Sequence, residues 1–262
     1  MNTVVDIDDL SFAYEARQIR ALEDVALSIA PGEAVALLGP SGAGKTTLLA
    51  LLDGRIQGWQ GRVKVLGHAL EPDRSPPPGR RADIGFIFQE FALVERSSVL
   101  RNVLNGRLGR MSTISALLGR YSEHDIAIAR QTLADCSIAD LADRRVDSLS
   151  GGQRQRVAIA RCLAQEPRLI LADEPVSHLD PTRTDEILSL ITGSAQTRGA
   201  TTIFVTHQPD LAVRFASRIV GVSEGRIAFD TPSNGTSDYD ITELYRGEVQ
   251  EPHPNAASPV LQ

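Results

Sequence analysis

The sequence predicts an α/β fold with a parallel sheet at its core, an antiparallel β subdomain beside it and a helical subdomain inserted into it. Short apolar runs at 34–38, 169–172, 202–205 and 219–222 have the length and composition of buried parallel strands, and helical stretches separate the later ones. Residues near the N-terminus alternate between apolar and polar, as antiparallel strands do. Residues 90–148 instead have a mainly helical pattern, with few clustered β-branched residues.

The N-terminal part predicts two strands, each with one apolar face. These faces carry Leu10, Phe12 and Tyr14 on the first strand, and Val25, Leu27 and Ile29 on the second. A third short strand over 61–67, bounded by glycines, completes the expected antiparallel sheet. Residues 75–81 contain consecutive prolines and are expected to form an exposed loop, neither helix nor central strand, before a further core strand over 84–88.

The segment after the 34–38 run has the pattern of a phosphate-binding loop, in which two glycines separated by four residues precede a lysine and a hydroxyl residue. It reads Gly39-Pro40-Ser41-Gly42-Ala43-Gly44-Lys45-Thr46, and Thr47 continues into an apolar helical stretch. Lys45 and Lys64 are the two lysines of the whole sequence, so a lysine at this point is a specific signal. A glycine turn before a helix is the structural alternative, and the sequence favours a P-loop NTPase core.

Each residue type in this loop suits a phosphate ligand. Glycines allow positive φ, so that successive backbone N–H groups can point at the anion, and the helix that starts near Lys45 adds its dipole. Lys45 is expected to reach the β- and γ-phosphates. The Thr46 hydroxyl is expected to bind Mg²⁺, an ion that prefers oxygen ligands.

Two carboxylates follow the apolar run at 169–172. Asp173 and Glu174 therefore stand at the carboxyl end of a predicted parallel strand, where open α/β sheets bind ligands. Asp173 is expected to hold Mg²⁺ directly or through water, and Glu174 to polarise the water that attacks the γ-phosphate. An acidic pair at a strand end often caps a helix instead, but a phosphate loop in the same sheet favours the metal site.

A second anion site is predicted at the start of a helix that runs through residues 154–161. The segment Leu149-Ser150-Gly151-Gly152-Gln153 places a hydroxyl and glycine N–H groups there. An ordinary N-cap is the alternative. Because the chain already has one phosphate site, the presence of a second one requires an explanation.

In their order along the chain, these motifs resemble those of the ATP-binding subunits of ABC transporters, up to about Gly247. That order comprises Tyr14, the loop 39–46, Gln89, the segment 149–153, Asp173-Glu174, the segment 177–180 and His207. The resemblance implies an ATPase that forms a head-to-tail dimer with a second copy of itself and binds two ATP molecules at the interface. The segment 149–153 of one subunit would then close over the γ-phosphate held by its partner, which accounts for two phosphate sites in one chain.

The resemblance also implies roles for single residues. Tyr14 would stack on adenine, for which a residue buried in the sheet is the alternative. Gln89 would sense the γ-phosphate and Mg²⁺ and lead to the membrane partner, and His207 would contact the γ-phosphate. Asp180 would connect the two ATP sites. His178 departs from the small residue that the family most often has at this position.

Within the family, residues 88–109, 111–123 and 206–208 resemble the ATP-binding subunits of phosphonate importers. This implies peripheral attachment to the cytoplasmic face of the inner membrane, integral membrane permease subunits as partners, and a periplasmic or surface solute-binding protein in the complex. An importer for another anion or a polar amino acid is one alternative. A soluble ABC-type ATPase that acts on nucleic acid or ribosomes is another.

The composition is that of a globular chain. Its 262 residues are 42% apolar, and the net charge of −6 argues against a nucleic-acid partner, which attracts surplus Lys and Arg. The sequence has no uninterrupted apolar stretch of roughly 20 residues, and its first residues lack the pattern of a signal peptide. We therefore expect the chain to stay in the cytosol.

The expected domain organisation is one ATP-binding domain over 1–247, with the helical subdomain at about 90–165, and a flexible acidic tail over 248–262. Cys136 and Cys162 are too few for a disulfide framework and lack the spacing of metal ligands. We expect both to be buried free thiols.

Overall fold

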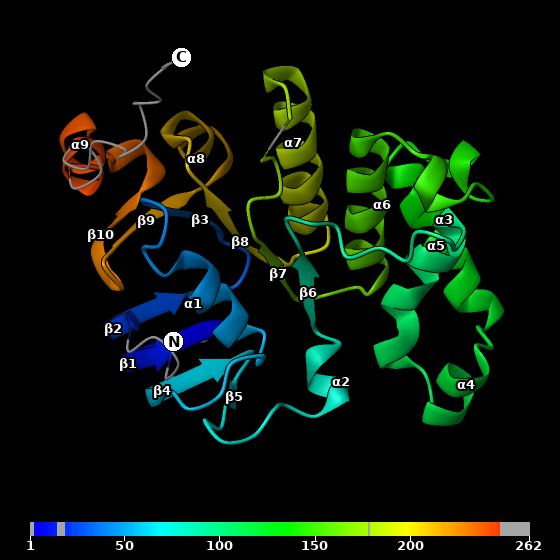
Figure 1. Cartoon of the computed structure of the whole chain (residues 1–262), viewed down its shortest axis with the longest axis horizontal. Helices are drawn as coiled ribbons and strands as arrows, with labels where there is room; N and C mark the ends of the chain where they lie inside the picture. The colour runs from blue at the N-terminus through cyan, green and yellow to red at the C-terminus, as the bar shows by residue number, and fades with distance from the viewer. Residues whose placement is uncertain (1–2, 15–18, 178, 247–262) are drawn as a thin grey trace, which may run out of the picture.

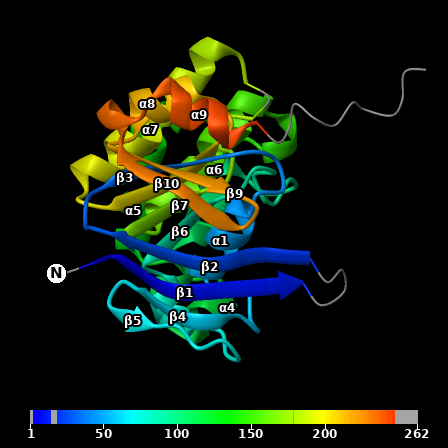
Figure 2. The same cartoon turned by 90° about the vertical axis from the view of Figure 1, so that its left-hand side faces the viewer.

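The computed structural model describes residues 3–14, 19–177 and 179–246. Figure 2 shows its layers: an antiparallel sheet on one side, a mostly parallel sheet in the middle, and helices α7, α8 and α9 on the other side. The predicted tail over 248–262 and the unusual His178 lie outside the described residues.

The smaller sheet is antiparallel and has the order β2-β1-β4-β5. Its strands are β1 (Val5–Tyr14), β2 (Ile19–Ile29), β4 (Gln60–Val65) and β5 (His68–Ala69). The alternating pattern at the N-terminus therefore predicted this sheet correctly, apart from the two-residue strand β5.

The larger sheet has the order β10-β9-β3-β8-β7-β6, and its five strands from β9 to β6 run parallel. The strands are β3 (Ala34–Leu38), β6 (Ile84–Ile87), β7 (Leu169–Ala172), β8 (Thr201–Thr206), β9 (Arg218–Ser223) and β10 (Arg226–Pro232). The five parallel strands are those predicted from the apolar runs. The antiparallel edge strand β10 was missed, because its half-buried residues interrupt the apolar pattern.

The helices are α1 (Lys45–Leu52), α2 (Pro78–Arg81), α3 (Val99–Leu104), α4 (Thr113–Leu118), α5 (Glu123–Asp135), α6 (Gly151–Ala164), α7 (Pro181–Thr197), α8 (Pro209–Phe215) and α9 (Asp238–Leu244). Short 3₁₀ turns are η2 (Asn105–Arg110), η3 (Ala139–Leu141), η4 (Val146–Ser148) and η5 (Ser233–Gly235). None of these helices is both long enough and apolar enough to cross a bilayer.

The expectation for residues 75–81 was wrong. Residues 75–81 were expected to contain no helix, yet α2 forms one turn within them. Pro78 is its first residue, and proline is tolerated there because the first N–H groups of a helix have no partner within the helix.

Helices α3, α4, α5 and α6 form a lobe on the side of the molecule away from β1 and β2 (Figure 1). Helix α5 begins with a capping box, in which Ser122 and Asp125 each accept a hydrogen bond from the other's backbone N–H. These helices lie within the range 90–165. The limits of the domains remain a prediction.

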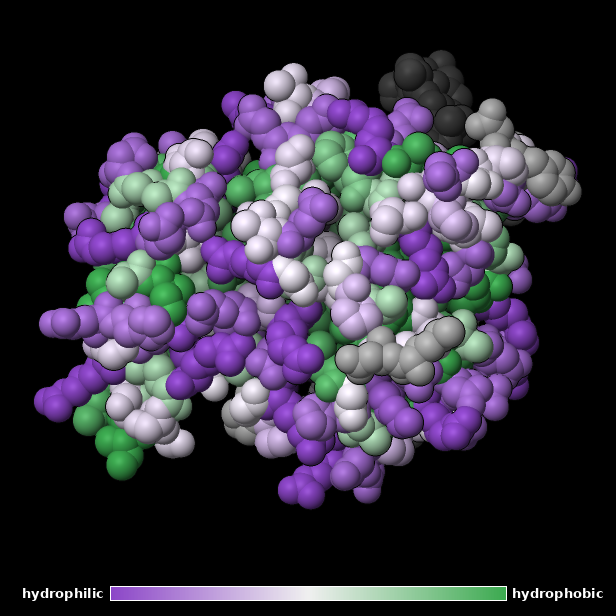
Figure 3. Space-filling model, turned by 180° about the vertical axis from the view of Figure 1, so that it is seen from behind, coloured by the Kyte–Doolittle hydropathy of each residue, from purple (hydrophilic) through white to green (hydrophobic). Residues whose placement is uncertain are grey.

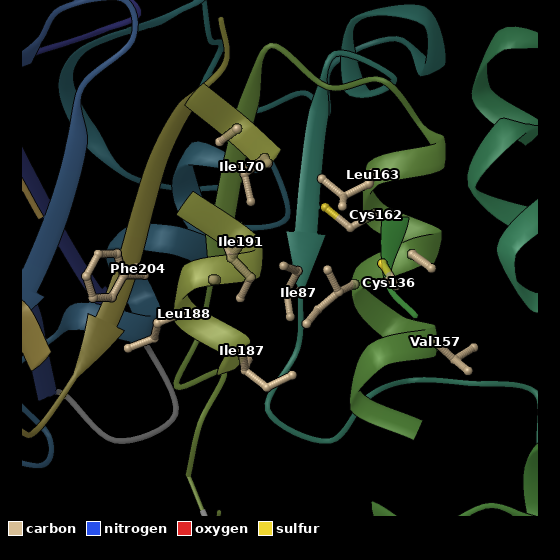
Figure 4. Packing of buried hydrophobic residues seen from close by; sticks show 14 of the residues in the cluster. Ile87, Cys136, Val157, Cys162, Leu163, Ile170, Ile187, Leu188, Ile191 and Phe204 are labelled. Carbon is tan, nitrogen blue, oxygen red and sulfur yellow. The ribbon is translucent and has the colours of Figure 1, made fainter. Parts of the chain in front are cut away.

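Successive residues of the parallel strands face two different hydrophobic clusters. In β3, Val35 and Leu37 face an inter-sheet cluster, which fills the space between the two sheets and around α1. Ala36 and Leu38 face a helix-side cluster, built with α3 and α5 to α8. Figure 4 shows this second cluster, where Ile87, Ile170 and Phe204 of the sheet lie near side chains of α6 and α7. Burial on both faces explains why these strands read as continuous apolar runs.

Cys136 and Cys162 both lie in the helix-side cluster and are free thiols, as predicted. Burial raises the pKa of each to about 12. Both stay protonated near neutral pH, so they have no role in the chemistry described below.

Candidate active site

The phosphate loop connects the end of β3 to the start of α1, and its glycines are required by close packing as well as by φ. Gly39 and Gly44 have φ values of 152° and 102°. A Cβ on Gly39 would lie 2.0 Å from the carbonyl oxygen of Val222, and one on Gly44 would lie 2.3 Å from that of Ala21. Larger residues would push the loop away from β9 and β2.

Lys45 lies folded inside this loop. Its side chain is only 4% exposed, and its Nζ donates hydrogen bonds to the carbonyl oxygens of Gly39, at 2.7 Å, and of Pro40, at 2.6 Å. A buried ammonium needs such acceptors. The loop thus holds a positive charge against its own backbone.

The structure brings two predicted metal ligands together across 127 positions of sequence. The hydroxyl of Thr46 donates to Oδ1 of Asp173 at 2.9 Å. Burial raises the pKa of the Asp173 carboxyl, and the hydrogen bond from Thr46 together with the nearby positive charges opposes that effect. A cation bound to this oxygen pair would favour the ionised carboxylate.

This oxygen pair could supply part of a metal site. Among the residues that the structure describes, no group of three or more His, Cys, Asp or Glu side chains could hold a metal ion. Mg²⁺ characteristically binds through one or two protein oxygens and completes its shell with water and phosphate oxygens. Thr46 and Asp173 therefore suit Mg²⁺ bound together with a nucleotide.

Glu174, the residue after Asp173, meets His207 at the same site. The imidazole Nε2 of His207 and Oε1 of Glu174 form a hydrogen bond. Glu174 has a left-handed backbone with φ of 45°, a conformation that costs energy for residues other than glycine. Its carbonyl accepts hydrogen bonds from the backbone N–H and the hydroxyl of Ser177, which hold this turn in place.

A pocket of about 440 Å³ joins these groups. Its walls are Tyr14, Ala21, Ser41, Gly42, Ala43, Gly44, Lys45, Thr46, Thr47, Glu174 and His207. Tyr14 stands at the pocket with 44% of its surface exposed, and its hydroxyl lies 3.3 Å from that of Thr47. Ala21 is the wall residue that the sequence analysis missed, because only the pairing of β1 with β2 brings it there.

The predicted second anion site lies elsewhere in the chain. Ser150 caps α6: its hydroxyl accepts from the N–H of Gln153, whose side chain accepts from the N–H of Ser150. Ser150, Gly152 and Gln153 line a separate hollow of about 270 Å³ between α6 and α7. Figure 1 shows α6 and α1 on opposite sides of β6 and β7. Within one chain, this segment and the phosphate loop do not share a pocket.

Two further predicted residues do not line the pocket. Gln89 is exposed, two residues beyond the end of β6. Asp180 is the N-cap of α7, where its carboxylate accepts a hydrogen bond from the N–H of Arg183 at 3.1 Å. The structure thus unites the phosphate loop, Asp173, Glu174 and His207, and leaves Gln89, Asp180 and the segment 150–153 outside.

The chain is similar to known proteins of one family. The family model described as "ABC transporter" matches residues 22–177. The chain is 42% identical to the phosphonates import ATP-binding protein PhnC 2 of Halalkalibacterium halodurans, covering 86% of this chain and 93% of that protein. It is 41% identical to the PhnC of Stutzerimonas stutzeri, with 95% and 92% of the two chains covered.

Solved structures of ABC transporter proteins also match the chain. The dimeric structure of a bacterial ABC transporter cassette matches with a TM-score of 0.78 and 31% identity, over 88% of this chain and 100% of that one. An inward-facing conformation of a transporter described as a putative metal-chelate type ABC transporter matches with a TM-score of 0.79 and 33% identity, over 94% and 90% of the two chains.

Proposed function

The chain belongs to the ABC transporter family of ATP-binding proteins, and on that premise we propose that it is the ATP-hydrolysing subunit of a phosphonate importer. One observation carries the ATPase assignment: a single pocket is lined both by residues 41–46 of the phosphate loop and by the hydrogen-bonded Glu174 and His207. The relatives named as phosphonate importers, similar over most of their length, support the solute.

The pocket suits ATP along its whole length. The ring of Tyr14 would stack on adenine at the pocket's edge. The N–H groups of residues 39–47 and the dipole of α1 would bind the phosphates. Lys45 would exchange its two carbonyl acceptors for β- and γ-phosphate oxygens, a charge-assisted contact that is stronger than the one it makes in the free loop.

Mg²⁺ is the metal we propose for this site, with Thr46 and Asp173 as ligands and Gln89 completing the contacts on the γ-phosphate side. When bound, it would neutralise charge on the phosphate oxygens. Gln89 would have to move toward the pocket from its exposed position.

Glu174 is proposed as the catalytic base. Its Oε1 would accept a proton from the water that attacks the γ-phosphate. The Nε2–H of His207 would donate to that carboxylate oxygen, hold the carboxylate in place and contact the γ-phosphate. Both side chains already face the pocket.

A second copy of the chain would complete each ATP site. The start of α6 is separate from the pocket of its own chain. Gly151 and Gly152 have ordinary helical geometry, and among the described residues a Cβ on either meets no close neighbour, the nearest being Arg183 Nη1 at 3.8 Å from Gly152. Glycines that the chain's own packing does not need suggest close approach by another molecule. We propose that Ser150, Gly151, Gly152 and Gln153 face the γ-phosphate of the partner's ATP, with Asp180 linking the two sites.

The remaining partners follow from the importer assignment. Integral membrane permease subunits would hold the chain at the cytoplasmic face of the inner membrane as a peripheral subunit, and a periplasmic or surface solute-binding protein would deliver the phosphonate. The net charge of −6 speaks against nucleic acid as the partner.

Reconstitution tests the solute. The chain would be purified with the permease and binding protein encoded beside it and placed in liposomes, and uptake of a labelled alkylphosphonate would be measured with and without ATP. ATP-dependent accumulation is expected. Uptake of inorganic phosphate or an amino acid alone would assign another solute, and purification with nucleic acid but no permease would overturn the transport assignment.

The base assignment predicts the behaviour of Glu174→Gln. The amide keeps the size of the side chain but cannot take the proton, so ATP binding should persist while turnover falls by about 10²-fold or more. ATP should then trap a dimer, measured by analytical ultracentrifugation. Glu123→Gln, at an exposed position in α5, is the control and should hydrolyse ATP normally. Near-normal hydrolysis by Glu174→Gln would contradict the assignment.

A further inference from the structure

The loop after β6 is strained at two consecutive residues. Phe91 and Ala92 both have left-handed backbones, with φ of 50° and 49°. Neither is glycine, so each pays a steric cost that persists only where the surroundings hold the conformation. The strain begins two residues after Gln89.

A single side chain of α6 holds both strained peptides. The guanidinium of Arg161 donates from Nη2 to the carbonyl oxygen of Phe91 at 2.9 Å, and from Nη1 to that of Ala92. No carboxylate among the described residues lies within ion-pair distance of Arg161. The two carbonyls are thus the acceptors for this half-buried cation, and a fork of two donors fits them in a way that a lysine ammonium cannot.

The far end of the loop is anchored separately. Asn102 of α3, almost fully buried, accepts from the N–H of Val94 at 2.8 Å and donates to the carbonyls of Val94 and Ser98 at 3.1 and 2.9 Å. The loop therefore has one fixed end in α3. At its Gln89 end, the N–H groups of Phe91 and Ala92 bond the carbonyls of Phe88 and Glu90 within the turn, and Arg161 is the side chain that ties this turn to α6.

Helix α6 is a rigid connection between this contact and Ser150. Val157, Ala158, Ile159 and Ala160 are completely buried, and Figure 4 shows the packed face of α6 against the sheet. Arg161 lies eleven residues after Ser150 in the same helix, about 16 Å along the axis. A displacement of the capped end of α6 would therefore move Arg161, and the loop carbonyls that it binds, by a similar distance.

We propose that Arg161 is a positioning residue that couples the two ATP sites of the dimer. The inference rests on the proposed function, in which Ser150 contacts the partner's ATP and Gln89 the chain's own. Closure of the dimer on Ser150 moves α6, and Arg161 passes that movement through the carbonyls of Phe91 and Ala92 to Gln89. Each subunit thereby adjusts its own site when its partner's ATP is engaged.

The test uses the purified full chain with Arg161→Ala and, as matched control, Arg198→Ala. Arg198 also donates to a carbonyl of α6, that of Leu163 at 3.2 Å, but its other partner is Asp135 of α5, and it does not line the pocket. Arg161→Ala should lower kcat by about 10- to 10²-fold, the cost typical of a misplaced catalytic group. Its Kd for ATP should stay within about threefold, because the phosphate loop is untouched. The Hill coefficient for ATP should fall toward one.

A second variant separates positioning from simple loss of structure. Glycine adopts a left-handed conformation without strain, so Ala92→Gly should restore part of the kcat and of the Hill coefficient in Arg161→Ala, and should not improve Arg198→Ala. Arg161→Lys, which keeps the charge but not the fork, should lie between the wild type and Arg161→Ala.

The possible outcomes are distinct. A wild-type chain without ATPase activity would refute the proposed function itself. An active wild type, with Arg161→Ala and Arg198→Ala equal in kcat and Hill coefficient, would overturn the coupling role alone. The Tm of Arg161→Ala shows whether that variant is unfolded. If it is, the kcat and the Hill coefficient of the Arg161→Lys and Ala92→Gly variants decide between coupling and loss of structure.

Discussion

At the scale of single residues, the feature that decides the chemistry is the burial of Lys45 in its own loop. The ammonium is satisfied by two backbone carbonyls before any ligand arrives. Its side chain is therefore ordered in place, so less conformational entropy would be lost if phosphate oxygens replace those carbonyls, as the proposed function requires.

The two lysines of the sequence can be substituted separately, one as the test and the other as its control. Lys45→Ala removes the cation nearest the phosphates and should lower kcat/KM for ATP by about 10²-fold or more, the usual cost of one charge-stabilising group. Lys64 is exposed in β4, so Lys64→Ala should leave ATP hydrolysis unchanged. Steady-state ATPase assays on both variants give the comparison, and equal activities would refute the role of Lys45.

At the scale of elements, α4 and α5 differ sharply in how they use apolar residues. In α4, Ile114, Leu117 and Leu118 are 73%, 86% and 59% exposed, and Figure 3 shows a hydrophobic tip in this region, at the lower left. In α5, Leu133 is 1% exposed and lies in the helix-side cluster. The two helices are neighbours in sequence, and only α5 contributes to the core.

This difference predicts opposite outcomes for the same substitution. Leu133→Ala should lower the free energy of unfolding by about 2–5 kcal/mol, because it removes buried methyl groups and leaves a cavity. Leu117→Ala should change it by less than about 0.5 kcal/mol, since that side chain is already in water. Urea unfolding followed by circular dichroism measures both. A large loss in Leu117→Ala would mean that α4 packs against something in solution.

The helices and strands also show how far the sequence could predict the structure. Local signals succeeded: the apolar runs marked the five parallel strands, the glycine frame marked the loop before α1, and Ser150 marked the start of α6. Features created by distant partners were not visible. Ala21 reaches the pocket through strand pairing, β10 forms only as an edge on β9, and Arg161 finds its carbonyls across about seventy positions of sequence.

At the scale of the whole molecule, the separation of the Ser150 segment from the phosphate loop makes one chain incomplete as an ATPase under the proposed function. Two copies placed head to tail would supply both halves of each site. The spare room at Gly151 gives a direct way to examine this idea, because none of the described residues has an atom within 4 Å of a Cβ at that position.

Gly151→Ala should leave the monomer's Tm unchanged or raise it, since alanine is favoured over glycine in helices by up to about 1 kcal/mol. In the Glu174→Gln background it should nevertheless weaken the ATP-driven dimer, because a methyl group would stand between the chains. Gly193→Ala, in α7, is the control, because a Cβ there also has no atom of the described part of the chain within 4 Å. Light scattering with ATP should show a dimer for the control and a monomer for Gly151→Ala, and two equal dimers would contradict the arrangement.

Successive side chains of β3 face two different clusters, which limits the sequence changes that this strand can tolerate. Exchange of one aliphatic residue for another within a strand preserves both clusters and leaves the loops at the strand ends where they are. Insertion of one residue would turn every later side chain of that strand to the wrong cluster and shift the loop that follows. Added residues should therefore be tolerated better between β4 and β6, or in the lobe around α4, than within the central strands.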